Sequence, residues 1–261
     1  MTAKAFNSCK NGMSPAARRV RLRRDAGADD WDHGPMMHSF HLALLPPALT
    51  LRALRRRPQA AGLRHAECLA LMRLGSPALS VERMQLRRLA MFAEWDDESA
   101  LERFLADDDL GRRLNGGWHV RLQYLRRYGE VAALAGLPVR AGRWDPEEPI
   151  VAVTLARLKV LELPRFLKWG RPVERLVAGH PGTTFATAAV RPPHTFSTFT
   201  IWRSVREMTD MVHGRSAVPQ AHTHTVAMAE QHRRDFHHES AFMRFRPLSE
   251  HGTWEGRTLL P

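Results

Sequence analysis

At two places in the chain, an alternating aromatic-rich segment stands directly before a segment with helical spacing. Residues 195–202 alternate and are rich in Thr, Phe, Ile and Trp, which predicts a strand with one buried face. After Ser204, Val and Met residues recur at helical spacing, and Ser204 with Glu207 has the pattern of a capping box. Both features predict a helix directly after the strand. Residues 89–105 repeat this arrangement.

The two strand–helix segments are related by one constant offset in residue number. Aromatic, capping and apolar positions all coincide when 107 is added to the number in the first segment. The matching pairs are Phe92 and Phe199, Trp95 and Trp202, Asp97 and Ser204, Leu101 and Met208, and Phe104 and Met211. The shared offset predicts a duplicated unit.

The predicted elements follow the order strand, helix, strand, strand, helix, strand, and this order occurs twice. The first set is residues 39–45, 49–63, 67–74, 83–95, 97–105 and 118–128, and the second is 150–158, 162–178, 183–190, 195–202, 204–212 and 241–247. This is the order of a ferredoxin-like α+β unit. Two such units can bury their exposed sheet faces against each other. We therefore expect a tandem duplication of a ferredoxin-like βαββαβ unit that forms an intramolecular α/β barrel.

Composition divides the chain into four parts. Residues 1–37 carry seven Lys or Arg against four Asp and little hydrophobic periodicity, which predicts a disordered basic tail or an authentic start at Met36 or Met37. Residues 38–134 form the first repeat, 135–149 a linker rich in Gly and Pro, and 150–261 the second repeat. A helical insertion is expected at 214–238, with Ser216 as its cap and Pro219 in its first turn.

Bulk properties exclude several classes of protein. A hydrophobic content of 44% excludes disorder throughout. Two cysteines, Cys9 and Cys68, make neither a disulfide framework nor a structural zinc site, so a reducing compartment is expected. Since no apolar run approaches the roughly 18 residues of a spanning helix, the expected location is cytoplasmic, with peripheral association at the inner face of a membrane left open. The net charge of +12 suits an anionic partner, but no nucleic-acid-binding motif accompanies it.

Four segments of the second half resemble the spheroidene monooxygenase family. They are residues 150–157 (IVAVTLAR), 195–202 (TFSTFTIW) with Met208 after them, 239–248 (ESAFMRFRPL) and 252–256 (GTWEG). The family comprises carotenoid ketolases related to the dimeric α/β-barrel, antibiotic-biosynthesis-monooxygenase-like superfamily. The first half matches more loosely, through its Trp95 strand and residues 142–144, so the resemblance covers residues 38–257.

The resemblance implies a haem-dependent monooxygenase that inserts oxygen, as a keto group, into a carotenoid or similar hydrophobic substrate. It also implies dioxygen and an external electron donor such as a ferredoxin, and it places His224 as the axial ligand of the haem iron. His222, two residues away, is the alternative ligand, and on a helix the two would project to nearly opposite faces. The irregular histidine spacing in the insertion disfavours zinc.

Two further groups of residues are candidates for the site, each with an alternative role. An apolar substrate pocket between sheet and helices could be lined by Phe166, Trp169, Phe199, Trp202, Met208 and Met211, which could equally be ordinary core. Arg244 and Arg246 share the face of the last strand opposite to Phe245. These arginines could pair with haem propionates, or lie on a solvated sheet edge.

No flavin, nicotinamide or phosphate-loop motif occurs in the sequence, and no catalytic residue can be singled out. Two other functions therefore stay open beside the haem monooxygenase. One is a cofactor-free α/β-barrel monooxygenase or small-molecule-binding protein of the same fold. The other is a basic nucleic-acid-associated protein. The sequence does not predict an oligomeric state.

Overall fold

The computed structural model describes residues 18–19, 36–72 and 83–261. The predicted basic tail therefore lies outside the described residues except at its positions 18–19 and 36–37. Arg18–Arg19 forms β1, a short strand beside the end of β9 (His237–His251).

Eight antiparallel strands close into one barrel. Their order is β9-β5-β2-β4-β3-β7-β8-β6, and β6 pairs again with β9 to complete the circle. The remaining barrel strands are β2 (Met37–Leu44), β3 (Leu63–Met72), β4 (Met84–Trp95), β5 (Trp118–Glu130), β6 (Ile150–Leu158), β7 (Thr183–Arg191) and β8 (Thr195–Trp202). Closure removes the unpaired edges that an open sheet would leave.

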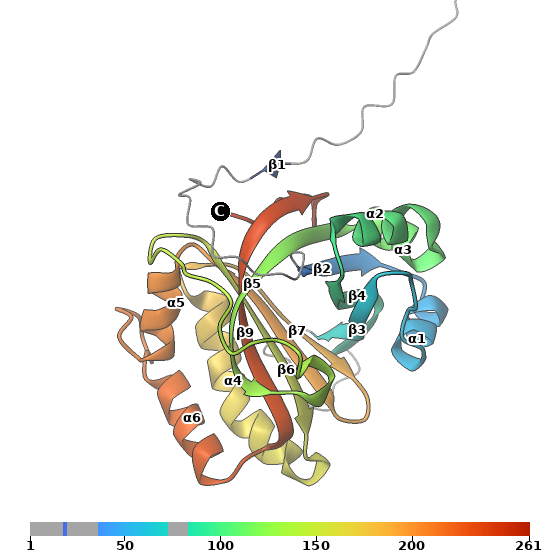
Figure 1. The fold of residues 1–261 in the computed structure, drawn as a ribbon. Coiled ribbons are helices and arrows are strands. Elements are labelled where there is room, and N and C mark those ends of the chain that lie inside the picture. The colour runs from blue at the N-terminus through green and yellow to red at the C-terminus, as the bar shows by residue number, and fades with distance from the viewer. Residues whose placement is uncertain (1–17, 20–35, 73–82) are drawn as a thin grey trace, which may run out of the picture.

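Helices cover the outside of the barrel in two groups (Figure 1). The first group is α1 (Pro47–Arg55), α2 (Glu98–Asp107) and α3 (Asp109–Asn115). The second is α4 (Leu163–Gly179), α5 (Val205–Val212) and α6 (Thr223–Arg233). Short 3₁₀ turns occupy Ala132–Leu134 and Val160–Glu162.

Each half of the barrel has the strand order of a ferredoxin-like unit. The first half reads β5-β2-β4-β3 and the second β9-β6-β8-β7, which in both cases is fourth, first, third, second. The halves join at two unequal seams, because β5 and β9 pair over eleven residue pairs whereas β3 and β7 pair over three. The predicted fold class, a barrel made of two ferredoxin-like βαββαβ units, is confirmed.

Matching positions of the two halves have matching environments. Phe92 and Phe199 both point into the barrel, where they belong to one core. Trp95 and Trp202 lie on the outer face, the first packed with residues of α2 and the second with residues of α5. Alternation along β4 and β8 explains this, since residues three apart in a strand face opposite sides.

The helices that follow these strands begin at equivalent caps. The Asp97 side chain accepts a hydrogen bond from the Ala100 amide at 2.8 Å. The Ser204 hydroxyl accepts one from the Glu207 amide at 3.2 Å. Both side chains satisfy an amide of the first turn that has no partner within the helix, so the predicted starts of α2 and α5 are confirmed.

Aromatic rings fill the middle of the barrel. The rings of Phe40 and Phe199 stack with centroids 3.7 Å apart, and Trp118 meets Phe199 edge-on at 6.1 Å. Trp118 also donates through Nε1 to Glu250 at 2.6 Å. The buried Glu250 carboxylate accepts from the backbone amide of Leu260 at 3.3 Å, which fixes the end of the chain against the barrel.

The helices differ from the prediction at the end of α1, at the start of α6 and in one additional helix, α3. The helix expected at 49–63 ends at Arg55, and α3 is an additional helix whose cap, Asp108, accepts from the Leu110 and Gly111 amides at 2.8 and 2.9 Å. The expected cap Ser216 does not start α6, which begins at Thr223. The Ser216 hydroxyl is instead engaged with His180 Nε2 at 3.0 Å, so it is not free to cap a helix.

One end of the barrel interior holds a buried carboxylate, Glu67, among cations. Its side chain is fully buried and lies 2.5 Å from Arg157, 2.6 Å from Arg191 and 3.1 Å from Arg57. Burial by itself would raise the pKa of Glu67, but hydrogen bonds from His65 and Arg157 and the arginine charges outweigh it and lower the pKa to about 2. These residues come from both halves, so the cluster joins them.

We expect the interior stack to be a main source of stability. Phe199→Ala should lower the free energy of unfolding by about 3–5 kcal/mol, because it removes a fully buried ring and leaves a cavity. Urea denaturation measures this loss. Leu44→Ala is the matched control, since Leu44 is 69% exposed and its truncation should change little. Equal effects of the two substitutions would contradict the assignment.

Acid should destabilise the barrel through Glu67. Its pKa falls from 4.5 to about 2 on folding, so its contribution is complete above pH 4.5 and is lost as the pH falls toward 2. We expect the free energy of unfolding to decline in this window in the native protein and to decline less in Glu67→Gln. Glu255→Gln, which changes an exposed carboxylate, is the control and should keep the native pH profile. Identical profiles for native protein and Glu67→Gln would refute the linkage.

Candidate functional site

A cavity of about 640 Å³ lies between the sheet of the second half and its three helices. Figure 1 shows α4, α5 and α6 together on one side of the barrel, beside β6 and β9. The strands contribute small side chains to its floor: Ala152, Thr154, Ala186, Thr198 and Thr200. Because these side chains are short, the helices do not close fully onto the sheet.

The matching positions of the first half are packed. The residues that correspond to Thr198 and Thr200 by the offset of 107 are Met91 and Ala93, which are fully buried beneath the first group of helices. Met91 extends much farther from its strand than Thr198. The helices of the first half therefore pack closely on their strands at these positions, whereas the helices of the second half leave a cavity above theirs.

Five of the six predicted pocket residues line this cavity, and one does not. Phe166 and Trp169 of α4, Trp202 of β8, and Met208 and Met211 of α5 all lie on its wall. Phe199 lies in the barrel interior instead, because it faces away from its neighbours Thr198 and Thr200. Its proposed place in the substrate pocket is therefore corrected to a place in the core.

His224, in the first turn of α6, lines the cavity. Its Nδ1 lies 3.0 Å from the carbonyl oxygen of Val212, at the end of α5. A carbonyl only accepts, so Nδ1 carries the proton and the lone pair of the neutral ring is on Nε2. Burial lowers the pKa of His224, although the hydrogen bond that Nδ1–H donates to the Val212 carbonyl acts in the opposite direction, so the ring is neutral near pH 7.

His222 lies elsewhere. It is exposed, occupies the N-cap position of α6 without a side-chain capping hydrogen bond, and lines a separate open groove together with Gly214 and Trp169. The two residue steps from His222 to His224 turn the two histidine side chains toward different surfaces. The structure thus brings His224, and not His222, to the cavity.

A second histidine on the cavity wall, His237, is buried and has no counterpart in the sequence prediction. Its Nδ1 lies 3.1 Å from Asp235 Oδ1, and its ring meets Phe166 and Phe236 edge-on. Burial lowers the pKa of His237, although Asp235 acts in the opposite direction. His237 is therefore a rival to His224, and no sequence signal beyond its place in a histidine-rich segment distinguishes it.

The two predicted arginines have different surroundings. Arg244 lines the cavity. Arg246 is outside the lining and is bound to Glu148 at 3.0 Å and to the Arg143 carbonyl oxygen at 2.9 Å. Its guanidinium is already paired, which leaves Arg244 as the predicted arginine that can meet a ligand in the cavity.

Arg244 has a neighbour that the sequence did not single out. Arg126 of β5 is its direct cross-strand partner, and both guanidiniums lie over the ring of Tyr128, at 4.1 Å for Arg126 and 5.2 Å for Arg244. Like charges at directly opposed positions are unfavourable. Among the described residues neither arginine pairs with a carboxylate. The two guanidiniums therefore place uncompensated positive charge at the edge of the cavity, beside Tyr128.

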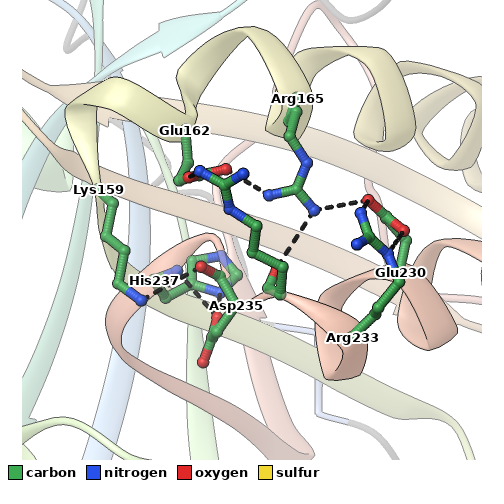
Figure 2. A network of polar contacts seen from close by, with 8 residues as sticks. Lys159, Glu162, Arg165, Glu230, Arg233, Asp235 and His237 are labelled. Atoms are coloured by element: carbon green, nitrogen blue, oxygen red, sulfur yellow. Dashed lines mark hydrogen bonds and ion pairs between the residues drawn. The ribbon is translucent and has the colours of Figure 1, made fainter.

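Charged side chains tie α6 to α4 across one end of the cavity (Figure 2). Arg165 of α4 contacts Glu230 of α6 at 2.6 Å and also contacts Glu162. Glu230 in turn binds Arg233 at 2.7 Å, and its pKa is lowered to about 2 by the hydrogen bonds from Arg233 and Arg165. The network fixes the helix that carries His224 relative to the wall that carries Phe166 and Trp169.

Within residues 36–72 and 83–261, three or more His, Cys, Asp or Glu side chains nowhere converge as they would around a protein-bound metal ion. Four histidines line the cavity without forming such a group: His213, His224, His232 and His237. In the same part of the chain, no helix is long and apolar enough to cross a membrane.

The chain is similar to spheroidene monooxygenase of Rubrivivax gelatinosus, with 27% identity over 183 residues. The alignment covers 65% of this chain and 64% of the relative, so the match spans less than two thirds of the relative's own length. The resemblance that the sequence motifs indicate is confirmed. No protein-family model matches the sequence.

Solved structures that match this chain are distant from it in sequence. An aldoxime dehydratase in complex with butyraldoxime matches with a TM-score of 0.51 and 11% identity, over 82% of this chain and 81% of that one. A putative monooxygenase from Fusobacterium nucleatum matches with a TM-score of 0.36 and 6% identity, over 85% of this chain and 96% of that one. The first of these likenesses supports the barrel fold.

We expect the cavity to bind apolar molecules and to be filled by one larger side chain on its floor. Thr198→Trp should occupy the space above β8 and weaken the binding of the fluorescent apolar probe 1-anilinonaphthalene-8-sulfonate several-fold, with little loss of folding. A fluorescence titration measures this. Leu248→Trp, at an exposed position outside the cavity, is the control and should bind like the native protein. Unchanged probe binding in Thr198→Trp would contradict the assignment of the cavity.

Proposed function

We propose that this protein is a haem-dependent monooxygenase of the spheroidene monooxygenase type, which inserts oxygen into a carotenoid or a similar extended hydrophobic molecule. The observation that carries the proposal is the setting of His224. The ring lines the cavity between the sheet and the helices of the second half, its Nδ1–H is fixed by the Val212 carbonyl, and its Nε2 is left for a metal. Histidines that bind metals are commonly oriented in this way by a hydrogen bond at the other nitrogen.

The rest of the cavity fits a haem group. A flat apolar macrocycle needs apolar walls, which α4 and α5 supply through Phe166, Trp169, Met208 and Met211. Its two propionates need cations, and Arg244 with Arg126 supplies two guanidiniums that no carboxylate in the described residues neutralises. His224 would hold the iron, and the arginines would hold the carboxylates.

When bound, haem would supply the activation of dioxygen that an apolar substrate requires. The protein's own residues would bind and orient the substrate along the apolar walls and exclude water. His237, held at Nδ1 by Asp235, can keep a proton at a defined atom of the cavity wall. The small floor residues Thr198 and Thr200 would leave room for substrate beside the cofactor.

Electrons would come from a separate protein. The chain has no flavin or nicotinamide motif of its own. Its net charge of +12 would draw an acidic donor such as a ferredoxin, because opposite charges speed the encounter of two proteins.

Titration of the purified protein with haemin tests the proposal. We expect a strong Soret band in the native protein, and roughly tenfold or more weaker haem binding, or a shifted band, in His224→Ala. His237→Ala is the matched control, because it removes another histidine of the cavity wall while His224 and Val212 stay in place.

Two outcomes would overturn parts of this proposal. Loss of the band in His237→Ala but not in His224→Ala would move the ligand to His237. A folded native protein that gives no Soret band would reject haem and favour the cofactor-free monooxygenase or small-molecule-binding protein of the same fold.

A further inference from the structure

Three apolar side chains protrude into solvent where β6 passes into α4. Val160 is 58% exposed, Leu161 94% and Leu163 38%. They lie on the 3₁₀ turn Val160–Glu162 and at the first residue of α4. Single exposed apolar residues are ordinary, but three within four positions on one protruding turn form a contiguous patch. We call residues 160, 161 and 163 the apolar tip.

Exposed cations lie beside the apolar tip, with one exposed carboxylate, Asp235, among them. Glu162 and Glu230 belong to the network of Figure 2, and their side chains are only 8% and 13% exposed. Their partners Arg234 and Arg233 are 61% and 66% exposed. The carboxylates are thus covered while the guanidiniums face solvent.

Two lysines extend this cationic surface. Lys159 directly precedes the apolar tip, and Lys168 is exposed on α4 little more than one turn beyond it. A surface with apolar residues at its centre and cations around them is complementary to an anionic bilayer, where acyl chains lie beneath negative headgroups.

The apolar tip adjoins the end of the cavity. Phe166, on the cavity wall, follows Leu163 by one helical turn. The amide of Lys159 donates to the carbonyl oxygen of Phe236 at 2.8 Å, and Phe236 also lines the cavity. A molecule held near Phe166 and Phe236 is therefore close to the surface that carries the apolar tip.

We propose that the apolar tip docks this protein on anionic lipid bilayers, with Leu161 inserted among the acyl chains and Arg233, Arg234 and Lys168 at the headgroups. The choice of lipid rather than an acidic protein rests on the proposed function, since a carotenoid-like substrate resides in lipid. Docking would place the Phe166 end of the cavity at the bilayer, so that an apolar substrate reaches the cavity without crossing water.

Vesicle co-sedimentation of the full chain, without haem or substrate, tests the docking. We expect binding to vesicles of equal parts phosphatidylcholine and phosphatidylglycerol, and weak binding to phosphatidylcholine alone. Leu161→Ser should weaken the partition coefficient roughly tenfold, and Lys168→Gln roughly fivefold. Added salt should weaken binding in the native protein.

Leu44→Ser is the matched control, because Leu44 is 69% exposed on the first half, away from the apolar tip. It should bind like the native protein. No binding to either kind of vesicle, or equal binding by native protein and Leu161→Ser, would overturn the proposal. So would a Leu161-dependent dimer without lipid in sedimentation velocity, which would assign the apolar tip to contact between copies. Because the assay contains no haem, its result is independent of the haemin titration.

Discussion

Alternation of side chains along closed strands is the constraint on which the rest of this structure depends. In a closed barrel every strand residue faces either the interior or the exterior, and no sheet edge offers a third environment. Inward residues such as Phe40 and Phe199 hold the two halves together. Outward residues are thereby free to differ between the halves. Met91 of the first half is packed beneath its helices, whereas the matching Thr198 of the second half lines a cavity.

The position of His224 depends on several elements at once. β8 sets the start of α5 through Ser204, the end of α5 supplies the Val212 carbonyl, and that carbonyl fixes the imidazole of α6. On the other side, Arg165 connects α6 to α4 through Glu230. The candidate ligand is therefore held by contacts to two neighbouring helices, although it lies in a short helix after an irregular loop.

The sequence predicted what local pattern controls and missed what tertiary contacts decide. Strand order, both helix caps and most cavity residues followed from periodicity and spacing. Phe199 was placed in the pocket because aromatic content alone does not show which face of β8 is turned inward. Ser216 resembled a cap, but its hydroxyl binds His180, which is distant in sequence. Arg126 and His237 carry no motif, and their roles arise only where β5 and β9 pair and where α4 covers the sheet.

The shorter of the two seams has a consequence for how the barrel comes apart. β3 and β7 share backbone pairing only from Ala70 to Met72, and beyond that point the seam continues as the ion pair between Glu67 and Arg191. Backbone hydrogen bonds do not titrate in acid, whereas this carboxylate does. Acid and heat should therefore open the molecule by different routes. Acid approaching pH 2 should loosen the β3–β7 seam first and let the two halves swing apart about the long β5–β9 pairing, before either half loses its own sheet.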